Sequence, residues 1–116
     1  MTARAVASLY GHLVRVEVIS EQTMRAASSP LFQGINALGW SIAYGMGFFL
    51  QTEAKPFGPV DVAFGNGGFG GSVAGAWPEY GIGFSYVMNE LRDEMQVEES
   101  RGHRLLKALH EAIKRT

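Results

Sequence analysis

A run of glycines near the middle of the chain restricts the fold more than any other feature. Residues 65–71 hold glycine at positions 65, 67, 68, 70 and 71. Glycine weakens a helix, tolerates positive φ and lets another backbone approach closely, so the run is typical of a strand edge and a tight turn. Apolar, β-like segments flank it at residues 60–64 and 72–77. The middle of the chain is therefore predicted to be sheet.

The hydrophobic period predicts helices on both sides of this sheet region. Thr2 and Ser20 stand where N-caps are expected, and apolar residues recur at helical spacing after Thr2. The last segment carries an apolar stripe of Leu105, Leu106, Leu109, Ala112 and Ile113. The expected elements, in order, are helices over 2–14 and 21–27, strands over 38–48, 60–64, 72–77 and 80–89, and a helix over 100–115. Strands grouped in this way favour an α+β fold, an antiparallel sheet flanked by N- and C-terminal helices, with residues 1–116 as a single domain.

Composition excludes several classes of function. The 116 residues carry a net charge of -1, which does not provide the concentrated basic surface that nucleic-acid binding needs. There is no cysteine, so disulfides, thiolate catalysis and Cys-ligated metals are excluded. No apolar stretch is long enough to span a bilayer, and no signal peptide is evident, so a cytoplasmic location is expected. No cofactor is predicted.

Other motifs are weaker than they first look. Residues 65–70 match G-x-G-x-x-G, but a dinucleotide site needs a helix next, and the following segment is β-like. Ser72 lies in a near match to the nucleophile elbow G-x-S-x-G. His12, His103 and His110 lack metal-ligand spacing, so we expect surface or helix-capping histidines and no metal site. The charged residues at 90–94 and 98–99 are expected to form a solvated linker, with an acid–base pair as the alternative.

The glycine segment and the residues after it resemble a motif of a known hydrolase family. Residues 64–72 (FGNGGFGGS), followed by 77–89 (WPEYGIGFSYVMN), look like the third conserved motif of serine β-lactamase-related esterases, class C β-lactamases and penicillin-binding-protein-like enzymes. In that family a strand carries Lys or His, then any residue, then Gly, and a hairpin and a strand ending in Met-Asn follow. The other predicted elements resemble the family in the same order. The resemblance implies a partial β-lactamase/transpeptidase-like fold, the C-terminal portion of the family's domain.

The resemblance also implies a mechanism whose central residues this sequence lacks. In the family, a Ser activated by the Lys of a Ser-x-x-Lys motif attacks an ester or amide carbonyl, and the Tyr of a Tyr-x-Asn motif helps move the proton. The Lys/His-x-Gly strand lines the pocket and supplies a backbone oxyanion donor. Neither Ser-x-x-Lys nor Tyr-x-Asn occurs in this sequence. Asn66 stands where the family has Lys or His, and it cannot carry positive charge.

These features favour a fragment of a β-lactamase-related serine hydrolase that is inactive alone. We predict no catalytic residue in this chain and a substrate-facing role for Asn66, Gly67, Gly68, Phe69 and Gly70. The expected ligand is a small ester or β-lactam, and the expected partner is a second copy or a missing N-terminal segment. The alternative is a non-catalytic binding or structural module that self-associates. An exposed apolar surface is expected at Trp40, Phe48, Phe49 and Phe57.

Overall fold

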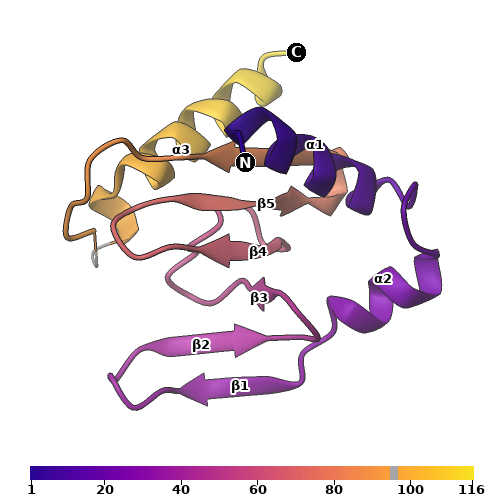
Figure 1. The fold of residues 1–116 in the computed structure, drawn as a ribbon, viewed down its shortest axis with the longest axis horizontal. Coiled ribbons are helices and arrows are strands. Elements are labelled where there is room, and N and C mark those ends of the chain that lie inside the picture. Colours follow the sequence, from indigo (N-terminus) through magenta and orange to yellow (C-terminus); the bar gives the residue numbers. More distant parts are fainter. Residues whose placement is uncertain (95–96) are drawn as a thin grey trace.

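Six strands form one antiparallel sheet in which each strand pairs with its neighbours in the chain (Figure 1). The structure is a computed structural model, and it describes residues 1–94 and 97–116. The strand order is β1-β2-β3-β4-β5-β6. The strands are β1 (Phe32–Ile35), β2 (Ser41–Tyr44), β3 (Phe49–Leu50), β4 (Phe64–Gly67), β5 (Val73–Trp77) and β6 (Ile82–Tyr86).

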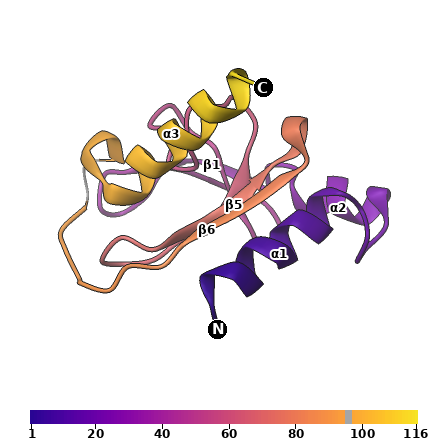
Figure 2. The ribbon, with the colours of Figure 1, turned by 90° about the horizontal axis from the view of Figure 1, so that it is seen from above.

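Helices cover both faces of this sheet, as the view from above shows (Figure 2). The helices α1 (Ala3–Val14) and α2 (Glu21–Ala27) pack on one face, and α3 (Arg101–Lys114) packs on the other. The predicted α+β class, with an antiparallel sheet between N- and C-terminal helices, is confirmed. In the part of the chain that the structure describes, no helix has both the length and the apolar character that crossing a membrane requires.

Each helix begins directly after a hydroxyl side chain and within one position of its predicted start. The side chains of Thr2, Ser20 and Ser100 each accept a hydrogen bond from the backbone N–H three residues later, at 3.1, 3.1 and 3.2 Å. These bonds satisfy donors in the first turn that have no partner inside the helix. The N-caps predicted at Thr2 and Ser20 are therefore confirmed, and Ser100 caps α3 in the same way.

Trp77 is the centre of the core between the sheet and α3. Its side chain is 0% exposed and packs with Phe84 of β6 and Leu106 of α3. Its indole N–H donates to the backbone carbonyl of Phe57 at 2.7 Å. That bond satisfies the one polar group of a buried indole and fixes the long loop between β3 and β4 to the sheet.

A second core joins α1 and α2 to the opposite face. The ring of Phe64 lies 4.9 Å from that of Phe48 and 6.1 Å from that of Tyr10, measured between centroids. Gly83 of β6 lets α1 lie directly against the strand, because a Cβ there would be only 2.9 Å from the Cα of Gly11. The absence of a side chain at position 83 therefore sets the distance between α1 and the sheet.

The strands differ from the prediction at four places, one of which is the strand predicted over 80–89, because it runs only from Ile82 to Tyr86. β1 was not predicted, because most of its residues are exposed and give no buried period. The predicted strand over 38–48 ends at Tyr44, since Gly47, with φ of 97°, reverses the chain into β3. The predicted strand over 60–64 lies instead at Phe64–Gly67, so the ladder runs into the glycines. Val60 and Ala63 are buried without joining the ladder.

The predicted apolar stripe of the last helix and the predicted set of exposed aromatic residues are each only partly confirmed. On α3, Leu106 is buried, whereas Leu105 and Ala112 are exposed, and the side facing the sheet includes Gly102 and His103. Of the four aromatic residues predicted to need cover, Trp40 and Phe49 are exposed, while Phe48 is half-buried and Phe57 is buried. The hydrophobic period predicts the buried face of α3 to within one residue. It does not predict which loop covers a given aromatic side chain.

Candidate functional site

The edge of β4 is open where the predicted substrate-facing residues begin. β3 pairs with β4 only at Phe49↔Gly65 and Leu50↔Phe64, whereas β5 pairs with β4 as far as Gly67. The backbone N–H of Gly68 donates to the carbonyl of Ser72 at 2.7 Å, so it points toward β5. Backbone groups alternate along a strand, and the N–H of Gly67 therefore points to the open side.

A tight turn follows this edge. Gly70 and Gly71 have φ of 97° and 122°, values that favour glycine. The Gly71 N–H donates to the Gly68 carbonyl at 3.2 Å, and the Arg101 guanidinium donates to the Gly70 carbonyl at 3.0 Å. Phe69, at the tip, is 91% exposed. The turn is thus held by α3 from behind while its tip faces outward.

The glycines of the run are not equivalent. A Cβ at Gly65 would overlap the Ala74 carbonyl oxygen and lie 2.7 Å from the Cα of Gly75. A Cβ at Gly67 would meet nothing closer than the Ser72 oxygen at 4.0 Å, and one at Gly68 nothing closer than 3.6 Å. Gly67 and Gly68 also lie outside the positive-φ region. The fold of this chain requires glycine at position 65 but leaves room for a side chain at 67 and 68.

Four of the five predicted substrate-facing residues share one cavity. Residues 67–70 line a hollow of about 320 Å³ together with Trp40 of the β1–β2 turn and residues 92–94. Asn66 does not line it. Because side chains alternate along a strand, Asn66 lies on the face of β4 that carries Phe64, and it is exposed there. The structure therefore separates Asn66 from the glycine turn.

An ion pair lies beside the turn where the sequence predicts a solvated linker. The Arg101 guanidinium donates to Glu94 Oε1, and the two side chains are only 18% and 9% exposed. Arg101 also donates to the Glu90 carbonyl at 2.8 Å. For Glu94 the solvated-linker prediction is wrong, because its side chain is buried against Arg101 at the start of α3, a contact that sequence spacing does not reveal. The side chain of Glu99 lies outside what the structure describes.

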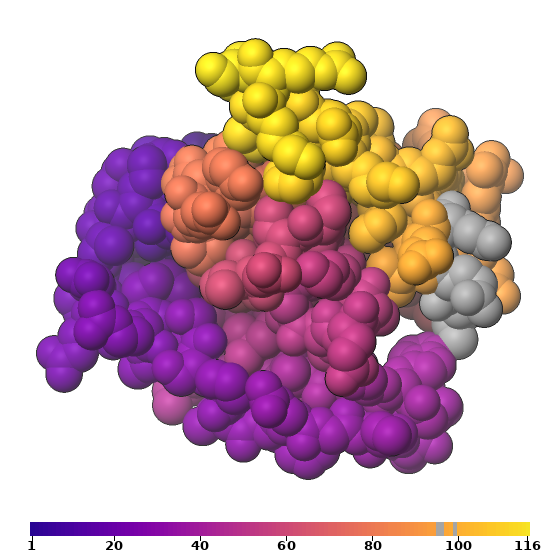
Figure 3. All heavy atoms as spheres, turned by 180° about the vertical axis from the view of Figure 1, so that it is seen from behind, coloured from indigo at the N-terminus to yellow at the C-terminus, as the bar shows by residue number. Residues whose placement is uncertain are grey.

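A larger cavity lies between the α3 face of the sheet and the loop after β3. Its volume is about 700 Å³, and its walls include Trp40, Phe49, Phe57 and His103. Seen from behind, the surface is hollowed between the purple chain near β1 and β2 and the orange start of α3 (Figure 3). Glu94 Oε2 and His103 Nδ1 have no hydrogen-bond partner, but both atoms are buried beneath the surface. The accessible walls are mainly apolar.

His103 and His110 correct the prediction of surface or capping histidines. His103 is buried, and His110 packs edge-on against Trp77 with ring centroids 5.9 Å apart. Burial, and then the positive charge of Lys107, lowers the pKa of His103 below its usual value, while Glu98 and the Lys55 backbone act in the opposite direction. His12 is exposed, as predicted, and pairs with Glu17.

The shifted pKa of His103 predicts a loss of stability in acid. The unfolded chain binds a proton at this ring near its ordinary pKa of about 6.5, while the folded chain resists protonation until lower pH. Stability from this group is therefore present above about pH 6.5 and is lost as pH falls through the folded pKa. His103→Gln should flatten the dependence of unfolding free energy on pH between about pH 7 and pH 5. Urea titrations at several pH values test this, and equal slopes for both proteins would contradict it.

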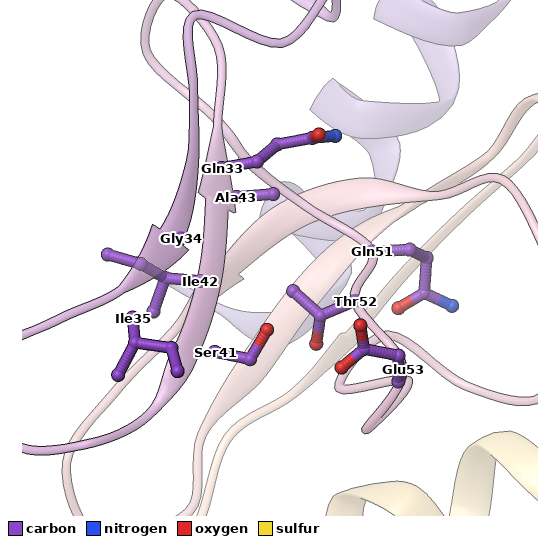
Figure 4. Close-up of a pocket in the computed structure, with 9 residues that line it drawn as sticks. All are labelled: Gln33, Gly34, Ile35, Ser41, Ile42, Ala43, Gln51, Thr52 and Glu53. Atoms are coloured by element: carbon purple, nitrogen blue, oxygen red, sulfur yellow. The ribbon is translucent and has the colours of Figure 1, made fainter.

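A third cavity, shown in Figure 4, lies on the β1–β2 side of the sheet. Its volume is about 480 Å³. The oxygens of Ser41, Thr52 and Glu53 lie near one another in this view (Figure 4). Within residues 1–94 and 97–116 no hydrogen bond joins Ser41 to a base. The cavity therefore shows no activated nucleophile.

The structure also tests the nucleophile elbow, the dinucleotide site and a metal site. Ser72 accepts a hydrogen bond from the Met88 N–H at 3.2 Å, and the segment after the glycines is strand β5. Neither a nucleophile elbow nor a dinucleotide site has this form, because each needs a helix there. Among the described residues, no three His, Cys, Asp or Glu side chains are grouped closely enough to hold a metal ion.

Comparison with solved structures shows what the whole arrangement resembles. A penicillin-binding protein homologue from Caulobacter crescentus superposes with a TM-score of 0.87 at 31% identity, over 96% of this chain and 32% of its own. A family VIII carboxylesterase superposes with a TM-score of 0.69 at 26% identity, over 75% of this chain and 25% of its own. No protein-family model matches the chain, and no curated protein does.

The chain therefore has the architecture of one part of the β-lactamase and penicillin-binding-protein fold. The resemblance predicted from the glycine segment and the residues up to Met88 and Asn89 is confirmed at this level, although β6 ends at Tyr86, before that pair. The chain spans about a third of the length of the first structure and a quarter of the second.

Proposed function

We propose that this chain supplies the substrate-facing strand and turn of a β-lactamase-related serine hydrolase and has no turnover by itself. The observation that carries the proposal is the open edge of β4 at Gly67, where pairing with β3 has ended. An acyl substrate that lies along this edge would meet the backbone N–H of Gly67, with which no neighbouring strand pairs on that side. A backbone N–H of this kind can stabilise the oxyanion of an ester or β-lactam carbonyl under attack.

The distribution of free space supports the same proposal. A Cβ would have room at Gly67 and at Gly68, because no other atom of the chain fills that space. A bare backbone is useful where a ligand must approach closely. The cavity of about 320 Å³ beside the turn is within the size range of small-molecule sites, and it is bordered by Trp40 and the exposed Phe69. The ligand class is a small ester or β-lactam.

The chemical step requires groups from outside this sequence. Attack on a carbonyl by Ser needs a base that takes the hydroxyl proton, and neither Ser-x-x-Lys nor Tyr-x-Asn occurs here. Asn66 can donate a hydrogen bond but adds no positive charge to the pocket. A second polypeptide or a further segment would have to supply the nucleophile and its base.

A transplant of the segment tests this role directly. Purified alone, the chain should hydrolyse neither p-nitrophenyl butyrate nor a chromogenic cephalosporin above background, and a fluorophosphonate probe should label no serine. A chimera that carries this segment in place of the matching part of the family VIII carboxylesterase should hydrolyse the ester. In that chimera Gly67→Ala should lower kcat/KM by at least about tenfold, because a methyl group there would project into the cavity beside the turn and keep a substrate away from the Gly67 N–H.

Gly34→Ala is the control in the chimera, since it adds the same methyl group on β1, away from the turn, where its nearest neighbour is the side-chain ring of Phe32 at 3.0 Å. Circular dichroism and thermal unfolding check that all three chimeras fold. Equal activity of the Gly67→Ala and Gly34→Ala chimeras would reject the pocket role. Stoichiometric labelling of the isolated chain by the probe would reject the absence of a nucleophile.

A further inference from the structure

β1 lies at a free edge of the sheet, and three of its four residues are exposed. β1 is the first strand in the sheet order and pairs only with β2. The N–H of Asn36 donates to the Trp40 carbonyl at 2.9 Å and so points toward β2. By alternation, the N–H and C=O groups of Gln33 and Ile35 point away from β2, to the open side. Figure 1 shows no helix along this border.

The segment that carries this edge has no charged residue, and the charge that directly follows it in the chain is Glu53, which lines the cavity beside β1. Residues 28–52 include no Asp, Glu, Lys or Arg. Ile35 and Leu38 are among the most exposed large apolar side chains of the chain, at 72% and 69%. Figure 4 shows the side chain of Ile35 extending from β1. Natural sheets commonly protect an edge with charged residues, proline or a covering element, and β1 has none of these within its four residues.

The lack of charge favours a second copy as the occupant of this edge. In a two-fold interface each residue meets the same patch of the other copy, so any net charge would face its own like charge. An uncharged stretch avoids that repulsion, whereas it offers nothing to attract a charged partner. Antiparallel pairing of a strand with itself also has two-fold symmetry and therefore closes as a dimer.

We propose that two copies of this chain pair through β1 to form a continuous antiparallel sheet across a two-fold axis at Gly34. Gln33 of each copy then lies opposite Ile35 of the other. The outward N–H and C=O groups of these two residues exchange backbone hydrogen bonds, and none of the four groups per pair is left without a partner. The two Gly34 residues face each other at the axis, where the absence of side chains permits close approach. This dimer does not depend on the proposed hydrolase role.

Gln33→Pro is the sharpest test of the pairing. Proline removes the N–H that points to the open side while leaving the donors that pair with β2, so β1 should remain in its own sheet. Sedimentation of the full chain over a concentration series should show a monomer–dimer equilibrium for the unchanged chain. The dissociation constant should rise by at least about tenfold in Gln33→Pro.

Ile35→Lys is a second variant that does not change the backbone. It places like charges near the axis and should weaken the dimer to a similar extent. Val62→Lys is its control, because Val62 is exposed to a comparable degree but lies outside the uncharged segment 28–52, and this variant should dimerise as before. A monomer at every concentration would overturn the proposal. Equal weakening by Val62→Lys and Ile35→Lys, or a dimer unaffected by Gln33→Pro, would overturn it as well.

Discussion

Replacing Trp77 with alanine should lower the free energy of unfolding by about 3–5 kcal/mol. The side chain is 0% exposed and contacts both the sheet and α3, so truncation leaves a large cavity in one of the two cores. It also removes the indole N–H, leaving the Phe57 carbonyl, which accepts from it at 2.7 Å, without that donor. The loop between β3 and β4 would lose its tie to the sheet.

The other tryptophan of the chain is the natural control for this experiment. Trp40 is 44% exposed and belongs to neither core cluster. Trp40→Ala should therefore change the unfolding free energy by less than about 1 kcal/mol. Urea denaturation followed by circular dichroism measures both variants. Similar losses for the two variants would mean that the core around Trp77 does not dominate stability.

The parts of the fold that the sequence predicts well are those set by local chemistry. Thr2, Ser20 and Ser100 cap helices because a hydroxyl satisfies N–H groups that the helix leaves free, and this depends only on neighbours in the chain. The hairpin between β5 and β6 is similarly local, with a short 3₁₀ turn at Pro78–Tyr80 and positive φ at Gly81. Such elements need no knowledge of tertiary contacts.

The parts that were missed depend on contacts between distant residues. β1 is held by its ladder with β2, although its own residues show no buried face. Glu94 is buried because Arg101 reaches it from α3, and His103 is buried because the helix face is one position away from the predicted stripe. At the site, the sequence identified the glycine run, but only the β3–β4 register shows where the edge becomes open.

The two glycines at positions 65 and 67 should respond very differently to the same added methyl group. Gly65→Ala should cost about 3 kcal/mol of unfolding free energy, because its Cβ would overlap the backbone of Ala74 and lie 2.7 Å from the Cα of Gly75. Backbone atoms of a central strand cannot move aside without separating β4 from β5. Gly67→Ala should change the free energy by less than about 1 kcal/mol and can raise it, since alanine restricts the unfolded chain.

Urea unfolding of the two variants and the unchanged chain measures this difference, and Gly68→Ala should behave like Gly67→Ala because its nearest neighbour is 3.6 Å away. Equal losses at positions 65 and 67 would show that the whole run is needed for folding. A loss of unfolding free energy at position 65 alone would separate two kinds of glycine. Gly65 lets β4 and β5 approach each other, whereas the packing of the chain does not require glycine at 67 and 68. In the proposed hydrolase role the second kind faces the substrate, so this stability measurement, combined with the chimera's kcat/KM, separates packing from recognition at the edge of β4.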